Sequence, residues 1–139
     1  MATVTEQNKA IVTRFNHEFI VKGNENVFHE LVADDLVNHS APAGTPNGPD
    51  SMFYFIRQIL CTGFPDIQVI IHDQVAEGDK VTTRKTFHAT HTGEFMGIPA
   101  FGKRVAIEVI DIIRMRDGKY VEHWGQSNLG EVRQLISEI

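Results

Sequence analysis

The feature that most constrains this chain is a strand–turn–strand pattern near its C-terminus. Residues 104–116 are largely apolar, Asp117-Gly118 is a dipeptide typical of a tight hairpin turn, and residues 120–126 form the second strand. Both alternate sets of positions in the first strand are apolar, so both faces of that strand require cover. We expect one face to pack on the core and the other to meet a second copy of the chain, in a homodimer formed through the sheet.

One acid, Asp111, interrupts the apolar strand. A buried carboxylate costs free energy unless it is paired or takes part in chemistry. If Val109 and Ile113 wall the carboxyl group, desolvation should raise the pKa of Asp111, as suits a general base that removes a proton from a carbon beside a carbonyl. In the structural alternative, Asp111 pairs with Arg84, Arg104 or another residue of the sheet.

His123, beside the only tryptophan, is the second candidate, and the turn decides whether it faces Asp111. A three-residue loop at 117–119 places Asp111 opposite Gly125 and puts His123 on the same face as Asp111. A two-residue loop places Asp111 opposite Trp124 and turns His123 away. The sequence leaves both registers open, and a half-buried sheet histidine bonded to backbone is the structural alternative for His123.

The N-terminal half predicts three helices with recognisable ends. Thr5 caps the first helix and Gly23 ends it, while the second spans residues 26–32. Pro49 suits the first position of the third helix, which ends near Cys61.

Four antiparallel strands and a closing helix follow. The strands are expected at residues 67–75, 80–91, 104–116 and 120–126, and the closing helix should turn Leu129, Val132, Leu135 and Ile136 inward. This order predicts an α+β fold in one domain over residues 1–139. A strongly curved, mostly antiparallel sheet wrapped around the N-terminal helices would leave an interior hydrophobic pocket.

Composition limits the partners of the chain. The formal net charge of -5 and the pI near 5.7 argue against nucleic acid or an anionic membrane as the main partner. No apolar run approaches the ~20 residues that span a bilayer, and the N-terminus lacks the pattern of a signal peptide. Cys61 is the only cysteine, so no disulfide forms within the chain, and we expect a cytoplasmic protein.

Two further histidines, His39 and His91, are supporting candidates for catalysis, although each also suits a structural role. His39 follows the second helix where that segment would meet the pocket, and His91 ends a strand. His88 and His91 lie three residues apart on a strand and so face opposite sides, which disfavours a shared metal. Since the sequence has no HExxH or CxxC motif, we expect no metal site.

Several motifs resemble those of a known family. They are HTGEFMGIP at residues 91–99, GKR at 102–104, IIRMRDGKYVEHW at 112–124, RQL at 133–135 and, more loosely, VNHS at 37–40. Together they resemble the SnoaL-like polyketide cyclase family of the NTF2-like superfamily. The resemblance implies a cone-shaped α+β barrel with a hydrophobic pocket, commonly as a homodimer.

The same resemblance implies a reaction. Characterised cyclases of this family close a ring by intramolecular aldol condensation, without metal or organic cofactor, and use a pocket aspartate and a pocket histidine as acid and base. Aligned through the RDGK turn, the cyclase histidine falls at Asp111 and the cyclase aspartate falls at Gly125. A second acid of the family is replaced by Ser127-Asn128. This chain therefore departs from the cyclase pattern at its acids.

The expected site combines both lines of argument. Asp111 would abstract or relay a proton, and His123, His39 or Asn128 would hydrogen-bond the enolate oxygen. The expected lining for a hydrophobic, possibly polycyclic ligand is Phe15, Phe19, Val109, Ile113, Trp124 and Asn128. The alternatives are a non-catalytic small-molecule-binding module and a cofactor-free hydroxylase or epoxide-opening enzyme on the same scaffold.

Overall fold

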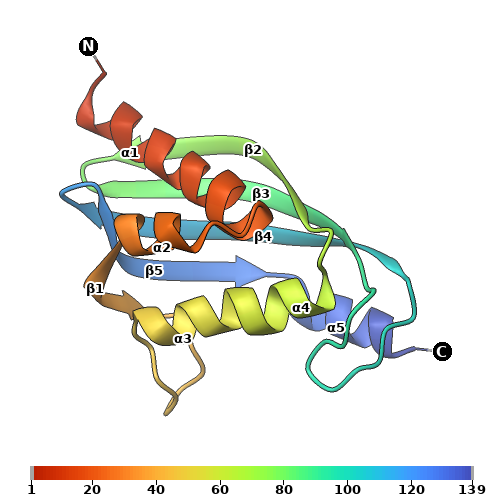
Figure 1. The fold of residues 1–139 in the computed structure, drawn as a ribbon. Coiled ribbons are helices and arrows are strands. Elements are labelled where there is room, and N and C mark those ends of the chain that lie inside the picture. The colour runs from red at the N-terminus through yellow and green to blue at the C-terminus, as the bar shows by residue number, and fades with distance from the viewer. Residues whose placement is uncertain (1, 139) are drawn as a thin grey trace.

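A curved five-stranded sheet with helices α1 to α4 on one face forms the centre of the computed structural model, which describes residues 2–138 (Figure 1). The helical segments are α1 (Val4–Arg14), η1 (Phe15–Val21), α2 (Glu25–Leu31), α3 (Pro49–Tyr54), η2 (Phe55–Leu60), α4 (Cys61–Gly63) and α5 (Leu129–Ser137). The strands are β1 (Val32–Asn38), β2 (Gln68–Glu77), β3 (Lys80–Thr90), β4 (Arg104–Arg116) and β5 (Lys119–Ser127). This architecture confirms the predicted α+β class.

The ends of the N-terminal helices follow local chemistry. Thr3 caps α1, since its side chain accepts a hydrogen bond from the N–H of Glu6 at 3.2 Å. The prediction of Thr5 as the cap is therefore wrong, because the helix begins before it. Gly23 has a φ of 75° and follows the end of η1, as expected for a glycine that ends a helix. Pro49 begins α3, and the helical path then continues through η2 and α4.

The sheet contains one strand more than the sequence predicts. Residues 32–38, expected as the end of a helix followed by an unassigned segment, form β1, which pairs in parallel with β5. The strand order is β1-β5-β4-β3-β2, so β1 and β2 are the edges. The partners of β1 lie some 85 residues later in the chain, as in the pair Asn38 and His123. Local sequence pattern carries little information about such a contact.

The β4–β5 hairpin combines features of both registers considered for it. Asp117 and Gly118, with φ values of 52° and 77°, form a two-residue turn between Arg116 and Lys119. The register then shifts between Arg114 and Met115, where β5 contains one additional residue in a bulge. From there on, Asp111 lies opposite Gly125 and Ile113 opposite His123. The bulge thus restores the register that a three-residue loop would have given.

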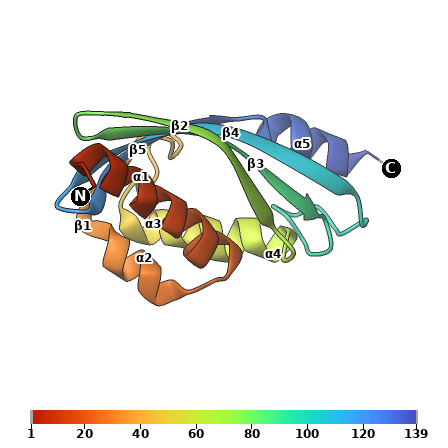
Figure 2. The ribbon, with the colours of Figure 1, turned by 90° about the horizontal axis from the view of Figure 1, so that it is seen from above.

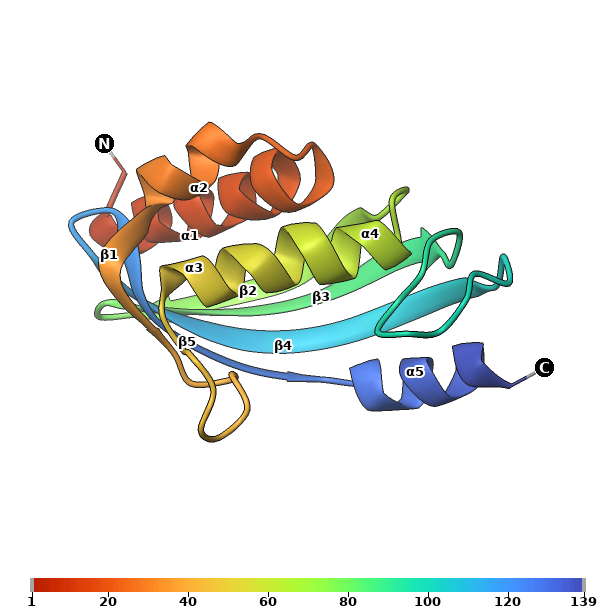
Figure 3. The same ribbon diagram turned by 60° about the horizontal axis from the view of Figure 1, so that its bottom comes forward.

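The two faces of the sheet differ in their surroundings. Helices α1 to α4 cover the inner face, and α5 lies beyond the end of β5, apart from the other helices (Figures 2 and 3). Ile113 and Met115 of β4 are buried on the inner face, whereas Ile110 on the outer face is 51% exposed. In α5, Val132 and Ile136 are buried as predicted. Leu135 is 46% exposed, so the prediction that it faces inward is wrong.

The loop after β3 packs closely on α4. The N–H of Gly93 donates to the carbonyl oxygen of Gly63 at 3.2 Å, and a Cβ at Gly93 would lie 1.9 Å from the carbonyl oxygen of Thr62. Glycine is therefore required at this position of the HTGEF motif because of space. Within residues 2–138, no helix is both long and apolar enough to cross a membrane.

Candidate functional site

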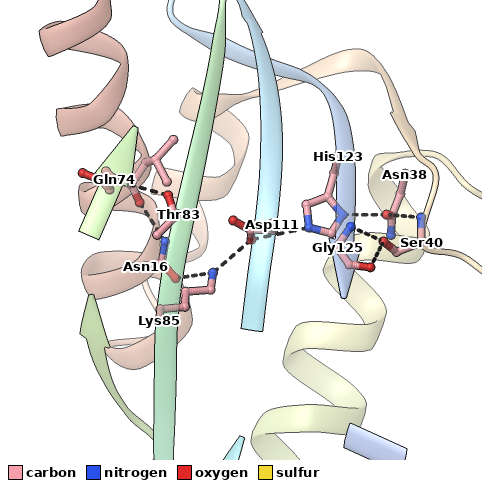
Figure 4. Close-up of polar contacts among 10 residues, drawn as sticks. Asn16, Asn38, Ser40, Gln74, Thr83, Lys85, Asp111, His123 and Gly125 are labelled. Atoms are coloured by element: carbon pink, nitrogen blue, oxygen red, sulfur yellow. Dashed lines mark hydrogen bonds and ion pairs between the residues drawn. The ribbon is translucent and has the colours of Figure 1, made fainter. Parts of the chain in front are cut away.

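A chain of polar side chains crosses the inner face of the sheet around Asp111 (Figure 4). Lys85 of β3 donates hydrogen bonds to Asn16 Oδ1 at 2.7 Å and to Asp111 Oδ2 at 3.2 Å. His123 Nε2 lies 3.5 Å from the same Oδ2 atom. Asn16, Lys85 and Asp111 are all buried. The cluster therefore joins an ammonium group, a carboxylate and an imidazole in an environment that excludes most water.

The charge on Asp111 is stabilised by its neighbours. Burial alone would raise the pKa of the Asp111 carboxyl, but Lys85 and His123 outweigh burial and hold that pKa below its usual range. The expectation of a raised pKa is wrong because it considered the apolar neighbours and not Lys85. The structural alternative, an ion pair between Asp111 and another residue of the sheet, is confirmed. The partner is Lys85, and neither Arg84 nor Arg104. Among residues 2–138, Asp111 Oδ1 has no hydrogen-bond partner.

His123 is the more accessible member of the pair. Its side chain is 19% exposed, whereas that of Asp111 is 7% exposed. Its second ring nitrogen, Nδ1, lies 2.8 Å from Asn38 Oδ1. The ring is thus held between Asn38 of β1 and Asp111 of β4. The structure places His123 and Asp111 on one face, as one of the two registers predicts.

The His123 ring occupies the space beside Gly125. A Cβ at Gly125 would lie 3.1 Å from His123 Cε1 and 3.3 Å from His123 Nε2. A side chain at this position would therefore compete with the ring for the space next to Asp111. The lack of a side chain at Gly125 leaves the space that the His123 ring occupies.

His39 and Trp124 do not join this cluster. Trp124 alternates with His123 along β5 and so points to the opposite face of the sheet. There it stacks on His39, with ring centroids 4.8 Å apart and an interplanar angle of 8°. His39 Nε2 also lies 2.8 Å from Glu122 Oε2. The two residues form an aromatic pair on the outer face, separate from Asp111.

His91 lies elsewhere in the core. Its side chain is fully buried against Phe64, with ring centroids 5.7 Å apart. Neither ring nitrogen has a hydrogen-bond partner in the described part of the chain. His91 follows Thr90, whereas Asp111 lies opposite Thr83 at the other end of β3, so the structure does not bring His91 to Asp111.

The residues expected to line a ligand pocket are divided among several places. Phe15 and Phe19 are buried in an aromatic core, with Phe15 packed 4.6 Å from Tyr120 between ring centroids. Ile113 is also buried in the core. Val109 and Asn128 line an open cleft of about 400 Å³ beside β3, β4 and α5.

A second cleft, of about 780 Å³, lies between α2 and α3 and is lined by residues that include Phe28 and Phe53. Neither of these two clefts is lined by Asp111 or His123. Asn128 also has a structural role, because its Oδ1 accepts a hydrogen bond from the N–H of Glu108 at 2.8 Å.

Sequence reasoning missed three residues of the cluster, Asn16, Lys85 and Asn38. Lys85 could have been identified, because it is a charged residue in the inward alternate set of β3, between Thr83 and Phe87. Asn16 and Asn38 give no comparable local signal. Among the described residues, no group of three or more His, Cys, Asp or Glu side chains is placed to hold a metal ion.

Comparison with known proteins gives a consistent result. A family model described as SnoaL-like polyketide cyclase matches residues 10–135 of the chain. No curated protein sequence matches the chain significantly.

Solved structures share the fold over nearly the whole chain. IdmH from Streptomyces antibioticus, a candidate polyketide cyclase, is 32% identical, with a TM-score of 0.78 over 93% of this chain and 98% of its own. AclR from Streptomyces galilaeus, a candidate hydroxylase, is 27% identical, with a TM-score of 0.84 over 97% of this chain and 83% of its own. A candidate SnoaL-like polyketide cyclase from Jannaschia sp. CCS1 has a TM-score of 0.86 at 24% identity, over 100% of this chain and 97% of its own, and shows a shared fold.

Proposed function

Because the chain belongs to the SnoaL-like polyketide cyclase family, we propose that it is an enzyme that closes a ring in a hydrophobic carbonyl compound by an aldol-type step without a cofactor. The observation that carries the proposal is the contact between His123 Nε2 and Asp111 Oδ2, 3.5 Å apart on the inner face of the sheet. A base and a carboxylate at this distance can remove a proton and stabilise the resulting charge.

The charges of the pair suggest which group is the base. A carboxylate whose pKa is held below its usual range is a weak base, so Asp111 is poorly suited to remove a proton from carbon. His123 is more accessible than Asp111, and an imidazole is in general a stronger base than a carboxylate. We therefore assign proton removal to His123 and stabilisation of the resulting imidazolium to Asp111.

The proposed step balances within the substrate. His123 Nε2 takes the proton from the carbon beside a carbonyl, and the enolate carbon attacks a second carbonyl of the same molecule to form the new carbon–carbon bond. The resulting alkoxide then takes the proton from the imidazolium. The product is an isomer of the substrate, and the base is restored.

The departure from the cyclase pattern is compatible with this assignment. The resemblance places the cyclase histidine at Asp111 and the cyclase aspartate at Gly125. This chain has an acid at the former position, and the ring of His123 lies over the latter. We propose that acid and histidine have exchanged strands, so that an acid–base pair is kept across β4 and β5.

The test is a turnover assay with product identification by mass spectrometry. Purified protein is incubated in air, without added cofactor, with an anthraquinone β-keto ester that can close a ring. We expect a product isomeric with the substrate that is absent when protein is omitted. Recovery of unchanged substrate from this compound and from related β-keto esters would contradict the proposal and favour a non-catalytic binding protein.

The similarity to AclR supports a second candidate function, cofactor-free hydroxylation. In the same assay, a hydroxylase would give a product heavier by one oxygen atom, and its formation would stop when oxygen is removed. Ring closure by an aldol step needs no oxygen. Parallel incubations with and without oxygen therefore separate the two candidates.

A further inference from the structure

We propose that Asn38 is a positioning residue that fixes the protonation pattern of the His123 ring, with the proton on Nδ1 and the reactive lone pair on Nε2. The segment from Asn38 to Ser40 would thereby act as a clamp on β5. The catalytic role of Asn38 rests on the proposed function. The protonation pattern of His123 is a property of the protein without substrate, and Figure 4 shows the residues that set it.

The orientation of the Asn38 amide determines which ring nitrogen of His123 carries the proton. The backbone N–H of Ser40 donates a hydrogen bond to the side-chain Oδ1 of Asn38 at 3.0 Å. A backbone N–H can only donate, so the atom that receives it must be the amide oxygen and not the amide nitrogen. The same oxygen lies 2.8 Å from His123 Nδ1. Since the oxygen only accepts, His123 Nδ1 must carry the proton.

The other ring nitrogen is then assigned by exclusion. A neutral imidazole carries one proton, so a proton on Nδ1 leaves Nε2 with its lone pair. Nε2 lies 3.5 Å from Asp111 Oδ2. A lone pair beside a carboxylate is repelled, whereas an N–H⁺ in the same place is attracted, so Asp111 favours arrival of a proton at Nε2. The nitrogen that faces Asp111 is therefore the one suited to accept a proton.

Ser40 and His39 tie the clamp to β5 at Gly125 and at His123. The Oγ of Ser40 accepts a hydrogen bond from the N–H of Gly125 at 2.8 Å and donates one to the carbonyl oxygen of Gly125 at 3.3 Å. The N–H of His39 donates to the carbonyl oxygen of His123 at 2.8 Å. These contacts hold the turn that follows β1 in a fixed position relative to His123.

Gly125 provides the space for the ring. Its backbone is outside the left-handed region, so its conformation does not require glycine. A Cβ would instead approach His123 Cε1 and Nε2 at 3.1 Å and 3.3 Å. Gly125→Ala should therefore push the ring away from Asp111 and leave the backbone unstrained.

The charged groups near the ring are few. Asp111 faces it from β4, and Lys85 of β3 acts on it through Asp111. Glu122, the neighbour of His123 on β5, is engaged with Arg114 and His39 on the outer face. Asn38, from β1, is uncharged. The charge state of His123 should therefore respond mainly to Asp111 and to any charge introduced at Asn38.

The test is a two-bond nitrogen–hydrogen NMR correlation on isotope-labelled protein without substrate. At a pH above the pKa of the imidazole, we expect the pattern of a neutral ring with the proton on Nδ1. Asn38→Leu should lose this preference, and Asn26→Ala, at an exposed position of α2, should keep it. A proton on Nε2 in the unaltered protein, or an unchanged pattern in Asn38→Leu, would overturn the proposal.

Asn38→Asp provides a conservative variant that keeps the acceptor. It should retain the proton on Nδ1 and raise the pKa of His123, because a second carboxylate then faces the imidazolium. An unchanged His123 pKa in Asn38→Asp would contradict the proposal even if Asn38→Leu did not fold.

Turnover data separate this inference from the proposed function. If ring closure occurs, kcat should fall roughly 10²-fold in Asn38→Leu with little change in KM. A protein with the proton on Nδ1 but without turnover would refute the proposed reaction and leave the tautomer assignment standing. Turnover by a protein with the proton on Nε2 would refute the tautomer assignment and leave the proposed reaction standing.

Discussion

Asp111 holds a charge inside an apolar sheet because the Lys85 ammonium, and His123 when it is protonated, lie against the same carboxylate oxygen. The Lys85 ammonium is in turn held by Asn16, whose amide nitrogen donates to the carbonyl oxygen of Val12 in α1. A buried ion pair of this kind adds little net stability, but removing one partner leaves an uncompensated charge. Removing one member of the pair should therefore lower the stability of the protein more than removing both members.

Lys85→Met should lower the free energy of unfolding by about 3–5 kcal/mol, because Asp111 would remain buried without its cation. Adding Asp111→Asn to Lys85→Met should recover part of this loss, since the buried charge is then removed. Chemical denaturation of both variants at neutral pH measures the difference. Equal stability of the single and double variants would show that the pair is not coupled.

Acid should destabilise the protein partly through Asp111. Because its folded-state pKa lies below the unfolded value, Asp111 contributes stability above the unfolded value of about 3.9, and this contribution is lost as pH falls through the lowered folded pKa. Asp111→Asn should therefore show a weaker loss of stability on acidification than the unaltered protein. Unfolding free energies measured from neutral pH down to below about pH 4 provide the comparison, and parallel curves would contradict this reasoning.

At the scale of elements, the register of the β4–β5 hairpin determines which residue of β5 lies opposite Asp111. The Asp117-Gly118 turn alone would put Asp111 opposite Trp124, and the bulge in β5 changes the partner to Gly125. The sequence predicted the hairpin and the turn dipeptide correctly because both are local. It could not predict the bulge, β1 or the Lys85 contact, since each depends on packing between segments distant in the chain.

The loop after β3 lies so close to α4 that Gly93 has no space for a side chain. Gly93→Ala should destabilise the protein by at least about 1–3 kcal/mol, because the new Cβ would overlap the carbonyl oxygen of Thr62. Gly130→Ala is a matched control in α5, where a Cβ meets no atom within 4 Å, and it should be neutral or stabilising by up to about 1 kcal/mol. Thermal unfolding of the two variants distinguishes them. A stable Gly93→Ala protein would mean that the loop moves easily.

At the scale of the whole molecule, the outer face of the sheet carries exposed apolar residues that include Ile70, Val75 and Ile110. Single exposed apolar residues are common, but several on one sheet face favour contact with another surface. We propose that two copies of the chain pair through this face, as the apolar pattern of β4 suggested. The helices on the inner face leave the outer face open for such contact.

Ile110→Lys should therefore convert a dimer to a monomer, because the interface would then bury an unpaired lysine from each copy. Val4→Lys, an exposed apolar position on α1, should leave the assembly unchanged. Sedimentation velocity gives the mass of each species. A monomer before any substitution would contradict the proposed pairing.

The central claim is that Asp111 and His123 together perform acid–base catalysis. The most direct measurement is the rate of ring closure at saturating substrate by Asp111→Asn and by His123→Gln, with folding confirmed by circular dichroism. We predict a fall of roughly 10²–10⁴-fold for His123→Gln and a substantial fall for Asp111→Asn. Rates equal to that of the unaltered protein in either folded variant would contradict the claim.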